Sequence, residues 1–306
     1  MSLIAHLKGT GPSGFGFAST ADDVTAGLNL REHTFIVTGC NSGIGKETVR
    51  SLGKRGARVI AAARTEEKAR AACAELQGEL MPAACDLAAP ASIRAFVETV
   101  KKWGVRPHAI ICNAGIMALP KLEQAFGYEL QFFTNHIGHF MLVTGLLDDL
   151  AETGRVVMVS SDAHRRAPKG GIEFDNLSGS RGYSPWAAYG QSKLANLLFA
   201  KELARKLAGT SKTSNAIHPG VIRTNLGRTM PQIAQAALKI AEPIFLKTPA
   251  QGAATQCYVA TNDKVAGVSG EYFADCNIAE PTAAARDSVL AARLWETSER
   301  IVAELR

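Results

Sequence analysis

The chain reads Thr38-Gly39-Cys40-Asn41-Ser42-Gly43-Ile44-Gly45 directly after an apolar run and directly before a segment with helical periodicity. Glycines lack a Cβ atom, so they let a chain turn tightly and bring its backbone close to a pyrophosphate. The free N–H groups and the dipole at the start of a helix then stabilise the negative charge. A plain turn is the alternative, but the strand before the loop and the helix after it favour dinucleotide binding. The candidate contacts are Gly39, Asn41, Ser42, Gly43, Ile44 and Gly45.

From Thr34 onward, short apolar runs alternate with helix-like segments, which is typical of βαβ units and a parallel sheet. The predicted strands are Thr34–Thr38, Arg58–Ala62, Leu80–Ala84, Ala109–Cys112, Arg155–Ser160, Thr213–Ile217 and Glu271–Phe273. The predicted helices are Gly43–Arg55, Glu66–Leu76, Ala91–Lys102, a long stretch from Leu122 to Leu150, and Trp186–Leu207. These elements predict an α/β fold, a Rossmann-type doubly wound sheet of seven mainly parallel strands with helices on both faces.

Neither an internal repeat nor a linker rich in Pro, Gly and Ser divides the chain, so we predict one catalytic domain over residues 34–306. Residues 1–33 form an N-terminal arm, because the stretch from Gly9 to Gly16 is too rich in glycine for regular structure. Residues 219–246 follow the carboxyl end of a strand, where open α/β sheets bind ligands. Because this segment also contains an apolar helical stretch, it is the candidate substrate lid.

The composition is that of an ordinary globular protein. The 306 residues are 46% hydrophobic, and a net charge of +6 is spread along the chain without a basic stripe, which argues against nucleic-acid binding. The six cysteines form no Cys-x-x-Cys pair, so we expect reduced thiols. Because no signal-peptide pattern and no membrane-spanning run of about 18 apolar residues is present, we expect a cytoplasmic protein without an integral membrane segment.

Three strand ends carry further candidate cofactor contacts. Arg64 follows the second strand, where an NAD-specific enzyme usually has an acidic residue, and its guanidinium can bind a 2′-phosphate, which favours NADP(H) over NAD(H). A solvated arginine is the alternative. Asp86-Leu87 follows the third strand and either contacts adenine or caps the next turn. Asn113-Ala114-Gly115 closes the fourth strand, where small residues let a cofactor lie over the sheet edge, or where Asn113 ties neighbouring strands together.

Tyr189 and Lys193 stand four residues apart in a predicted helix, and this spacing puts a phenol and an ammonium on one face. A free tyrosine has a pKa of about 10. We expect Lys193 to lower the pKa of Tyr189 toward the working range of an acid/base catalyst, while a solvated helix face is the alternative. A buried strand that ends in Ser160-Ser161 precedes this helix, and Ser161 can donate a hydrogen bond to a substrate oxygen. Ser160 is the structural alternative, since neighbouring strand residues point to opposite faces.

These motifs together resemble the short-chain dehydrogenase/reductase family over a span from about Thr34 to Phe273. The resemblance is carried by the glycine loop, Asn113-Ala114-Gly115, Asn135, Ser161, Tyr189 with Lys193, and His218-Pro219-Gly220. Residues 132–140 and 189–196 resemble the branch of retinol dehydrogenases and the WW-domain-containing oxidoreductase.

The resemblance implies a role for each matching residue. It implies that Asn135 holds a water in a proton relay through Lys193 to Tyr189, that Lys193 grips the nicotinamide ribose, and that Ser161 orients the carbonyl. It also implies contacts to the nicotinamide carboxamide from the turn Pro219-Gly220-Val221 and from Thr224, although Pro219 alone is also typical of a strand end. Ser42 stands where many NADP-dependent members have a basic residue, so Arg64 is the main argument for NADP(H).

We therefore expect an NADP(H)-dependent oxidoreductase that transfers a hydride between nicotinamide and a carbonyl or alcohol carbon. A non-catalytic dinucleotide sensor on the same fold is the first alternative, but an intact set of Asn135, Ser161, Tyr189 and Lys193 argues against it. An epimerase or dehydratase of the extended relatives is the second alternative, and the spacing of the loop glycines disfavours it.

The substrate is predicted only as a class. The apolar residues Phe174, Trp186, Met230, Ile233 and Phe245 suggest a retinoid-like, steroid-like or aromatic carbonyl compound, although such residues also serve in an ordinary core. His136 and His139 lack a third ligand, so we expect no metal. A homo-oligomer is expected from the resemblance alone, because family members often pair through the long helices.

Overall fold

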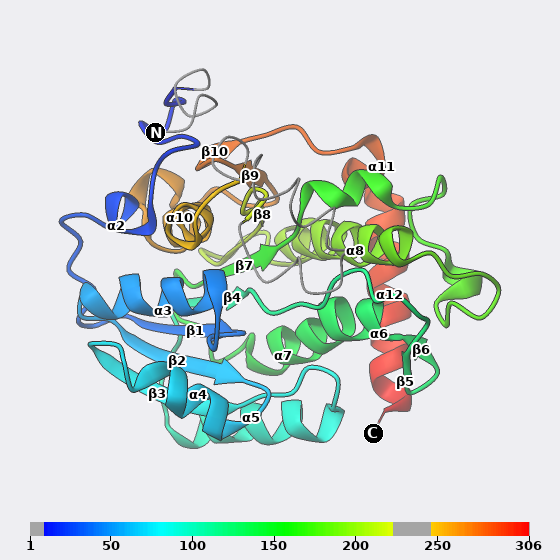
Figure 1. Ribbon diagram of the computed structural model, residues 1–306, viewed down its shortest axis with the longest axis horizontal. Helices are drawn as coiled ribbons and strands as arrows, with labels where there is room; N and C mark the ends of the chain where they lie inside the picture. Colours follow the sequence, from blue (N-terminus) through cyan, green and yellow to red (C-terminus); the bar gives the residue numbers. More distant parts are fainter. Residues whose placement is uncertain (1–8, 223–245, 306) are drawn as a thin grey trace, which may run out of the picture.

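The computed structural model describes residues 9–222 and 246–305, and its centre is one twisted sheet with helices on both faces (Figure 1). The strand order is β10-β9-β8-β7-β4-β1-β2-β3. The bounds are β1 Thr34–Thr38, β2 Arg58–Ala63, β3 Glu79–Ala84, β4 Ala109–Cys112, β7 Arg155–Val159, β8 Thr213–His218, β9 Tyr272–Ala274 and β10 Asn277–Ile278. All neighbours pair in parallel except β9 and β10. The predicted doubly wound, mainly parallel fold is therefore confirmed.

The order of strands reverses at β1, which pairs with β2 on one side and with β4 on the other. Chain connections leave this point in opposite directions, and open α/β sheets bind ligands outside the carboxyl ends of the strands at such a switch point. The glycine loop follows β1, and Asn113 follows β4. The topology therefore brings two of the predicted cofactor motifs to one place.

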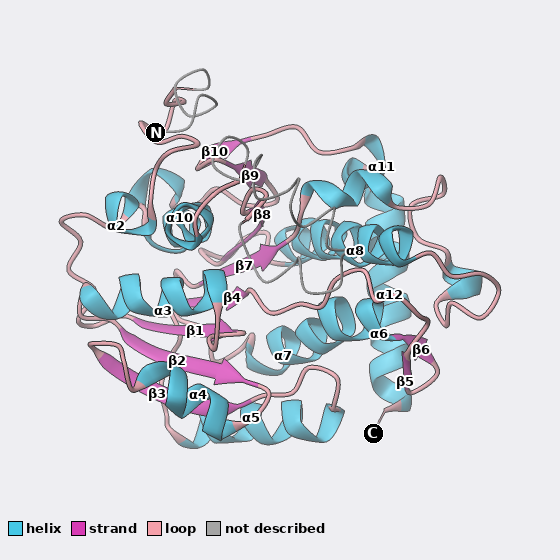
Figure 2. Ribbon diagram, viewed as in Figure 1, coloured by secondary structure: helices cyan, strands magenta, loops and turns pink. Residues whose placement is uncertain are grey.

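Helices bury both faces of the sheet (Figure 2). One hydrophobic cluster lies under α2 Ala21–Val24, α3 Gly43–Lys54, α4 Glu66–Cys73 and α10 Pro249–Thr261. The other lies under α5 Pro90–Lys102, α7 Gly138–Leu146, α8 Pro185–Lys206 and α12 Ser288–Glu304. Strand β1 contributes Phe35 and Val37 to the first cluster and Ile36 to the second. Burial on both faces explains why these strands are continuous apolar runs.

The predicted number of seven strands is wrong, because the sheet has eight. The eighth strand, β10, has two residues and pairs antiparallel with β9. It follows a turn at Asp275 and Cys276, whose φ angles are +50° and +63°. A two-residue strand has no apolar run that a periodicity analysis detects, and its place at the sheet edge comes from the turn.

The predicted long helical stretch from Leu122 to Leu150 is also wrong in its first part. It begins with a hairpin of β5 Gln124–Ala125 and β6 Tyr128–Glu129, joined by Phe126 and Gly127 with φ angles of +54° and +82°. Two successive positive φ angles are typical of a type I′ hairpin turn. The helical part follows as α6 Leu130–Phe132, a π-helical turn Phe133–Ile137, and α7. Sequence analysis predicted neither α10 nor α12, and α11 Ala283–Arg286 is also new.

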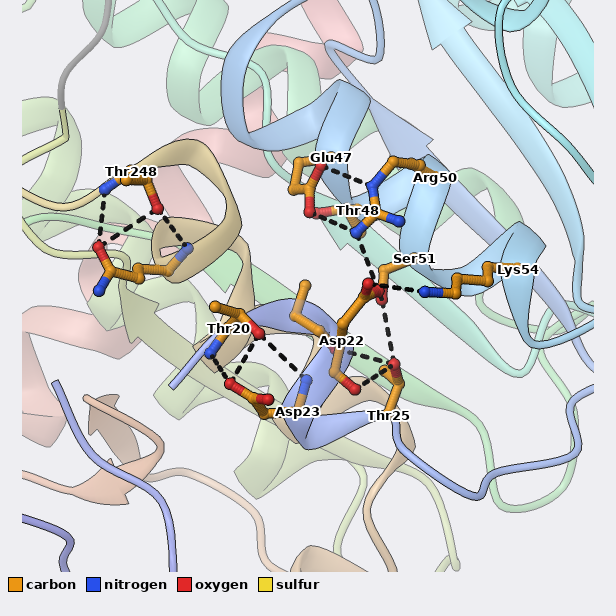
Figure 3. Close-up of polar contacts among 12 residues, drawn as sticks. Thr20, Asp22, Asp23, Thr25, Glu47, Thr48, Arg50, Ser51, Lys54 and Thr248 are labelled. Carbon is orange, nitrogen blue, oxygen red and sulfur yellow. Dashed lines mark hydrogen bonds and ion pairs between the residues drawn. The ribbon is translucent and has the colours of Figure 1, made fainter. Parts of the chain in front are cut away.

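The N-terminal arm packs on the side of the sheet that carries α3 and α10. Ser13 N–H donates to Asn277 Oδ1 at 3.0 Å, and Lys264 Nζ donates to the Ser13 carbonyl at 3.1 Å. Thr20 caps α2 in a reciprocal capping box with Asp23. The polar contacts between this short helix and α3 are drawn in Figure 3. The division of the chain into an arm and a single domain stays a prediction.

Asp22 of α2 joins the arm to α3 through two cations. Its carboxylate lies 2.9 Å from Arg50 and 2.9 Å from Lys54 (Figure 3). Burial alone would raise the pKa of Asp22, but hydrogen bonds from Lys54 and Arg50 hold this pKa at about 2. The carboxylate is therefore ionised throughout the neutral range, and it fixes the arm beside the C-terminal half of α3.

Helix α12 covers α8 through an aromatic cluster. Trp295 is 6% exposed and stacks on Phe199 of α8 at 5.5 Å between ring centroids. Its ring also meets the edge of Phe140 of α7 at 4.8 Å. Lys206 Nζ lies 4.7 Å from the Trp295 ring centroid, a cation–π contact at the end of α8. The helix that carries Tyr189 is thus held on its outer side by the C-terminal helix.

We predict that Trp295→Ala lowers the free energy of unfolding by about 3–5 kcal/mol, because it removes a large buried ring and leaves a cavity. The control is Val289→Ala on the same helix, whose side chain is 78% exposed; this change should stay within about 0.5 kcal/mol. Urea denaturation followed by circular dichroism measures both values. Equal effects of the two substitutions would contradict this account of α12.

Candidate active site

Helix α8 is attached to the carboxyl end of β7 by three hydrogen bonds. Lys193 Nζ donates to the Val159 carbonyl at 2.9 Å, and Asn196 Nδ2 donates to the same carbonyl at 3.1 Å. Ser160 Oγ donates in turn to the Lys193 carbonyl at 2.7 Å. The Ser160 hydroxyl is therefore engaged in a bond to α8, which confirms the structural role that was its alternative. The Lys193 side chain is buried, with 3% exposure. The attachment fixes which face of α8 looks onto the end of the sheet.

Tyr189 lies one turn before Lys193 on this face. The Lys193 Nζ atom is 5.7 Å from the centroid of the Tyr189 ring. The Tyr189 hydroxyl shares a hydrogen bond with Ser161, the second residue after β7. Ser161 Oγ also accepts from Ala163 N–H at 3.2 Å, at the start of a 3₁₀ turn over Asp162–Arg166. Ser161, Tyr189 and Lys193 all line one cavity of about 470 Å³.

Asn135 approaches the same place from the π-helical turn. Its Oδ1 accepts from Ile116 N–H at 2.8 Å, and its Nδ2 donates to the Ile116 carbonyl at 2.9 Å and to Ser192 Oγ at 2.9 Å. A Cβ atom on Gly115 would lie 3.1 Å from Asn135 Oδ1 and 3.4 Å from Lys193 Nζ. The four predicted catalytic residues therefore converge around Gly115, although the sequence did not predict the π-helical turn that carries Asn135.

Burial controls the protonation of the tyrosine and the lysine. It raises the pKa of Tyr189 to about 12, and the hydrogen bond from Ser161 only partly opposes this rise. Burial lowers the pKa of Lys193 to about 8. The prediction that Lys193 lowers the pKa of Tyr189 is not met in the protein alone, because burial of the phenol raises this pKa and the hydrogen bond that opposes the rise comes from Ser161. Tyr189 therefore carries its proton at neutral pH.

The glycines of the loop let its backbone turn and pack closely after β1. Gly39 has a φ angle of +71°. A Cβ atom on Gly45 would collide with the Gly39 carbonyl and would lie 2.6 Å from Asn113 Nδ2. Ser42 stands at the N-cap of α3 without a side-chain cap, so the amides of the first turn at Gly43, Ile44 and Gly45 are available to an anion. Among the loop residues, Ile44 lines the cavity.

The residues that follow the other strands had either a structural or a cofactor-binding role as alternatives, and the structure favours different alternatives for different residues. Arg64 is exposed at the end of β2, and no hydrogen bond or ion pair is found for it among the described residues. Asp86 Oδ1 accepts from Ala88 N–H at 3.0 Å, which is the turn-capping alternative. The Leu87 side chain belongs to the core. Asn113 Nδ2 donates to the Thr38 carbonyl at 2.8 Å and ties β4 to β1, the structural alternative for this residue.

The turn after β8 forms another wall of the cavity. Pro219, Gly220 and Val221 line it, and Gly220 has a φ angle of +90°. Thr224 lies outside the described residues, as do Met230, Ile233 and Phe245. Of the predicted substrate contacts within the described residues, Trp186 lines the cavity. Phe174 does not; it lies beside α12, where the Arg293 guanidinium is 4.0 Å from its ring centroid.

Two residues near the cavity were not singled out as site residues from the sequence. His218 lines the cavity and accepts from Asp162 N–H through Nδ1 at 3.2 Å. Lys247 is 1% exposed and lies 2.6 Å from the Asp275 carboxylate, while its N–H donates to the Val221 carbonyl at 2.8 Å. The His218-Pro219-Gly220 motif was a signal for the histidine. Lys247 is 28 positions further along the chain than Pro219, and no spacing rule connects the two.

His136 and His139, for which we expected no metal, both have hydrogen-bond partners within the protein. His136 Nε2 lies 2.8 Å from Ser298 Oγ of α12, and His139 contacts Thr38 and the Asn135 carbonyl. No cluster of three or more potential metal ligands is found in residues 9–222 and 246–305. Within the same ranges, every helix is too short or too polar to cross a bilayer.

A family model described as short chain dehydrogenase matches residues 33–233. This chain belongs to the short-chain dehydrogenase family. Short-chain dehydrogenase TIC 32 B, chloroplastic, from Brassica napus is 43% identical, and the match covers 100% of both chains. Human retinol dehydrogenase 14 is 39% identical over 89% of this chain and 87% of its own. The predicted family and its retinol dehydrogenase-like branch are therefore confirmed.

A solved structure of an uncharacterized protein from Mycobacterium Paratuberculosis has 33% identity and a TM-score of 0.75, with 93% of this chain and 97% of that chain covered. Short-chain dehydrogenases use a nicotinamide dinucleotide, and the glycine loop, the uncapped start of α3 and the cavity that Gly115 lines fit such a group. The chain is accordingly an oxidoreductase of alcohol or carbonyl groups.

We predict that the rate of carbonyl reduction falls as pH rises through about 8, because Lys193 loses its proton there. Below this pKa the ammonium is charged and can supply a proton, and above it the supply is lost. The pH dependence of kcat/KM for the cofactor measures the pKa in the free enzyme. In Lys193→Arg the charged form persists, so any residual activity should lack this alkaline decrease. A wild-type rate that stays constant to pH 10 would contradict the assignment.

Proposed function

We propose that this protein is an NADP(H)-dependent oxidoreductase that transfers a hydride between nicotinamide and the carbonyl or alcohol carbon of an apolar small molecule. The observation that carries the proposal is the convergence of Ser161, Tyr189 and Lys193 on one cavity at the switch point of the sheet. Each of the three supplies a different function: a hydrogen-bond donor, a proton donor and a buried cation.

The residues act on the substrate oxygen in the following way. Ser161 donates a hydrogen bond that orients this oxygen toward Tyr189. Because the pKa of Tyr189 is about 12, its hydroxyl is protonated at neutral pH and gives its proton to the oxygen as negative charge develops there. Lys193, with Asn135 beside it, resupplies the proton. When bound, the nicotinamide supplies the hydride chemistry, and the protein supplies position and electrostatics.

Arg64 supports NADP(H) over NAD(H). Its exposed guanidinium stands at the end of β2 without an acidic partner among the described residues, and it is free to form charge-assisted bonds with a 2′-phosphate. The nearest acidic residue along the chain, Glu66, is paired with Arg70 within α4. Position 64, where an NAD-specific enzyme usually has an acidic acceptor for the ribose 2′-hydroxyl, holds this arginine instead.

The cavity walls support an apolar substrate. They include the side chains of Ile116, Met117, Val159, Trp186 and Ile222. The name of the human relative, retinol dehydrogenase 14, adds support for a retinoid-type compound. A cytoplasmic location and a homo-oligomer stay predictions, and the Brassica napus relative is named as chloroplastic.

We predict that NADPH binds more tightly than NADH and that Arg64→Ala removes this preference. Loss of a charge-assisted contact to phosphate costs about 1.5–3 kcal/mol, or roughly ten- to hundredfold in the Kd for NADPH. The Kd for NADH should not change. Fluorescence titration measures all four values, and Arg106→Ala, an exposed arginine before β4, is the matched control.

The same protein is then incubated with NADPH and a panel of retinoid, steroid and aromatic carbonyl compounds, and consumption of NADPH is followed. Turnover of any member supports the proposal. Tight binding without turnover across the panel would instead favour a dinucleotide sensor, and failure to bind either nucleotide would overturn the assignment.

A further inference from the structure

We propose that His139 is a positioning residue of the active site, which holds the backbone carbonyl of Asn135 at one ring nitrogen and the end of β1 at the other. The inference rests on the proposed function, since it concerns the same proton path. His139 lies on α7, one turn after Asn135, and its side chain is fully buried.

The contacts of the ring fix which nitrogen carries the proton. His139 Nδ1 lies 2.9 Å from the Asn135 carbonyl oxygen, which only accepts hydrogen bonds, so Nδ1 must be the donor. Burial lowers the pKa of His139 to about 4, and the ring is therefore neutral at physiological pH. A neutral imidazole has one N–H, so Nε2 is an acceptor.

The other end of the ring meets Thr38, the last residue of β1. Thr38 Oγ1 lies 2.9 Å from His139 Nε2, and because this nitrogen accepts, the hydroxyl donates. The same hydroxyl oxygen accepts from Ala114 N–H at 3.0 Å. A directed chain of hydrogen bonds thus runs from Ala114 through Thr38 and His139 to the Asn135 carbonyl.

This chain joins both halves of the site. Thr38 begins the glycine loop, and Ala114 precedes Gly115, against which Asn135 and Lys193 are packed. The side-chain amide of Asn135 is already engaged by Ile116 and Ser192. His139 therefore sets the direction of the Asn135 backbone carbonyl, which keeps a second lone pair for a further donor.

His136 is a matched control for this assignment. It lies two residues before the start of α7 and is 1% exposed, but its Nε2 contacts Ser298 of α12, and neither residue lines the cavity. Burial lowers the pKa of His136 even further, to about 3. The two rings share burial and neutrality, and they differ in whether they contact Asn135.

Two substitutions separate the two ends of the ring. The amide nitrogen of His139→Asn stands near the place of Nδ1 and can still donate to the Asn135 carbonyl, whereas the amide of His139→Gln reaches the place of Nε2 and serves Thr38. We expect kcat close to wild type in His139→Asn and in His136→Gln. We expect His139→Gln to lower kcat roughly ten- to hundredfold, because a displaced catalytic group costs rates of this order. The Kd for NADPH and the KM for the carbonyl substrate should not change in any of the three.

A purely structural role would lower stability and binding without changing the proton step. We therefore also expect a larger solvent deuterium isotope effect on kcat in His139→Gln than in wild type. Equal losses in the Asn and Gln variants, or an unchanged kcat and isotope effect in His139→Gln, would overturn the proposal.

Nitrogen-15 NMR of histidine-labelled wild-type protein tests the bonding without any turnover. His139 and His164 should both be protonated at Nδ1 alone, because His164 Nδ1 lies 2.7 Å from the Ser161 carbonyl and its Nε2 accepts from Thr282 N–H. His139→Asn should remove one of these two signals, which assigns it to His139. Protonation of His139 at Nε2 would overturn the proposal even if the variants fail to fold. If the wild-type protein reduces no carbonyl compound, the proposed function fails, and the NMR result still decides whether the His139 contacts exist.

Discussion

The active site depends on the burial of one ammonium group against one carbonyl. Lys193 brings its charge into the interior between α8 and β7, where desolvation costs several kcal/mol unless hydrogen bonds offset it. The Val159 carbonyl accepts from it, and the bonds from Asn196 and Ser160 hold the same helix at the same strand end. Because this attachment fixes the rotation of α8, it also fixes Tyr189 one turn earlier and places its hydroxyl beside Ser161. Helix α12 holds the opposite side of α8 through Trp295.

The parts of the site that the sequence predicts are those set by local geometry. A helix of 3.6 residues per turn puts Tyr189 and Lys193 on one face wherever the helix lies, and a strand, glycine loop and helix define the start of α3. Other parts depend on contacts between distant segments. The role of Ser160 follows from the position of α8, and the π-helical turn at Asn135 has no signature in residue type or period. The position of Phe174 outside the cavity is a further case, because it is set by packing beside α12, where Arg293 contacts its ring.

Burial contradicts the prediction about the protonation of Tyr189, and hydrogen bonds decide between the alternatives for Asp86 and Asn113. The proximity of a lysine to a tyrosine predicts a lowered phenol pKa, but desolvation outweighs this effect in the protein alone and leaves a protonated Tyr189. This protonation state suits a residue that donates to a developing alkoxide. Asp86 and Asn113 have backbone partners that account for them structurally, so the proposed preference for NADP(H) rests on Arg64. The site therefore combines fixed buried groups near the reacting atoms with one exposed cation at the far end of the cofactor motif.

The proposed reaction is a hydride transfer, and it can be tested by following the transferred hydrogen itself. NADPH deuterated at both hydrogens of its reactive nicotinamide carbon is incubated with the protein and a carbonyl compound that it reduces, and the product is examined by mass spectrometry and NMR. The account predicts deuterium bound to the carbinol carbon of the alcohol, and no such product from Tyr189→Phe, which should still bind NADPH. A product whose carbinol hydrogen comes from solvent, or a Tyr189→Phe variant with unchanged turnover, would contradict it.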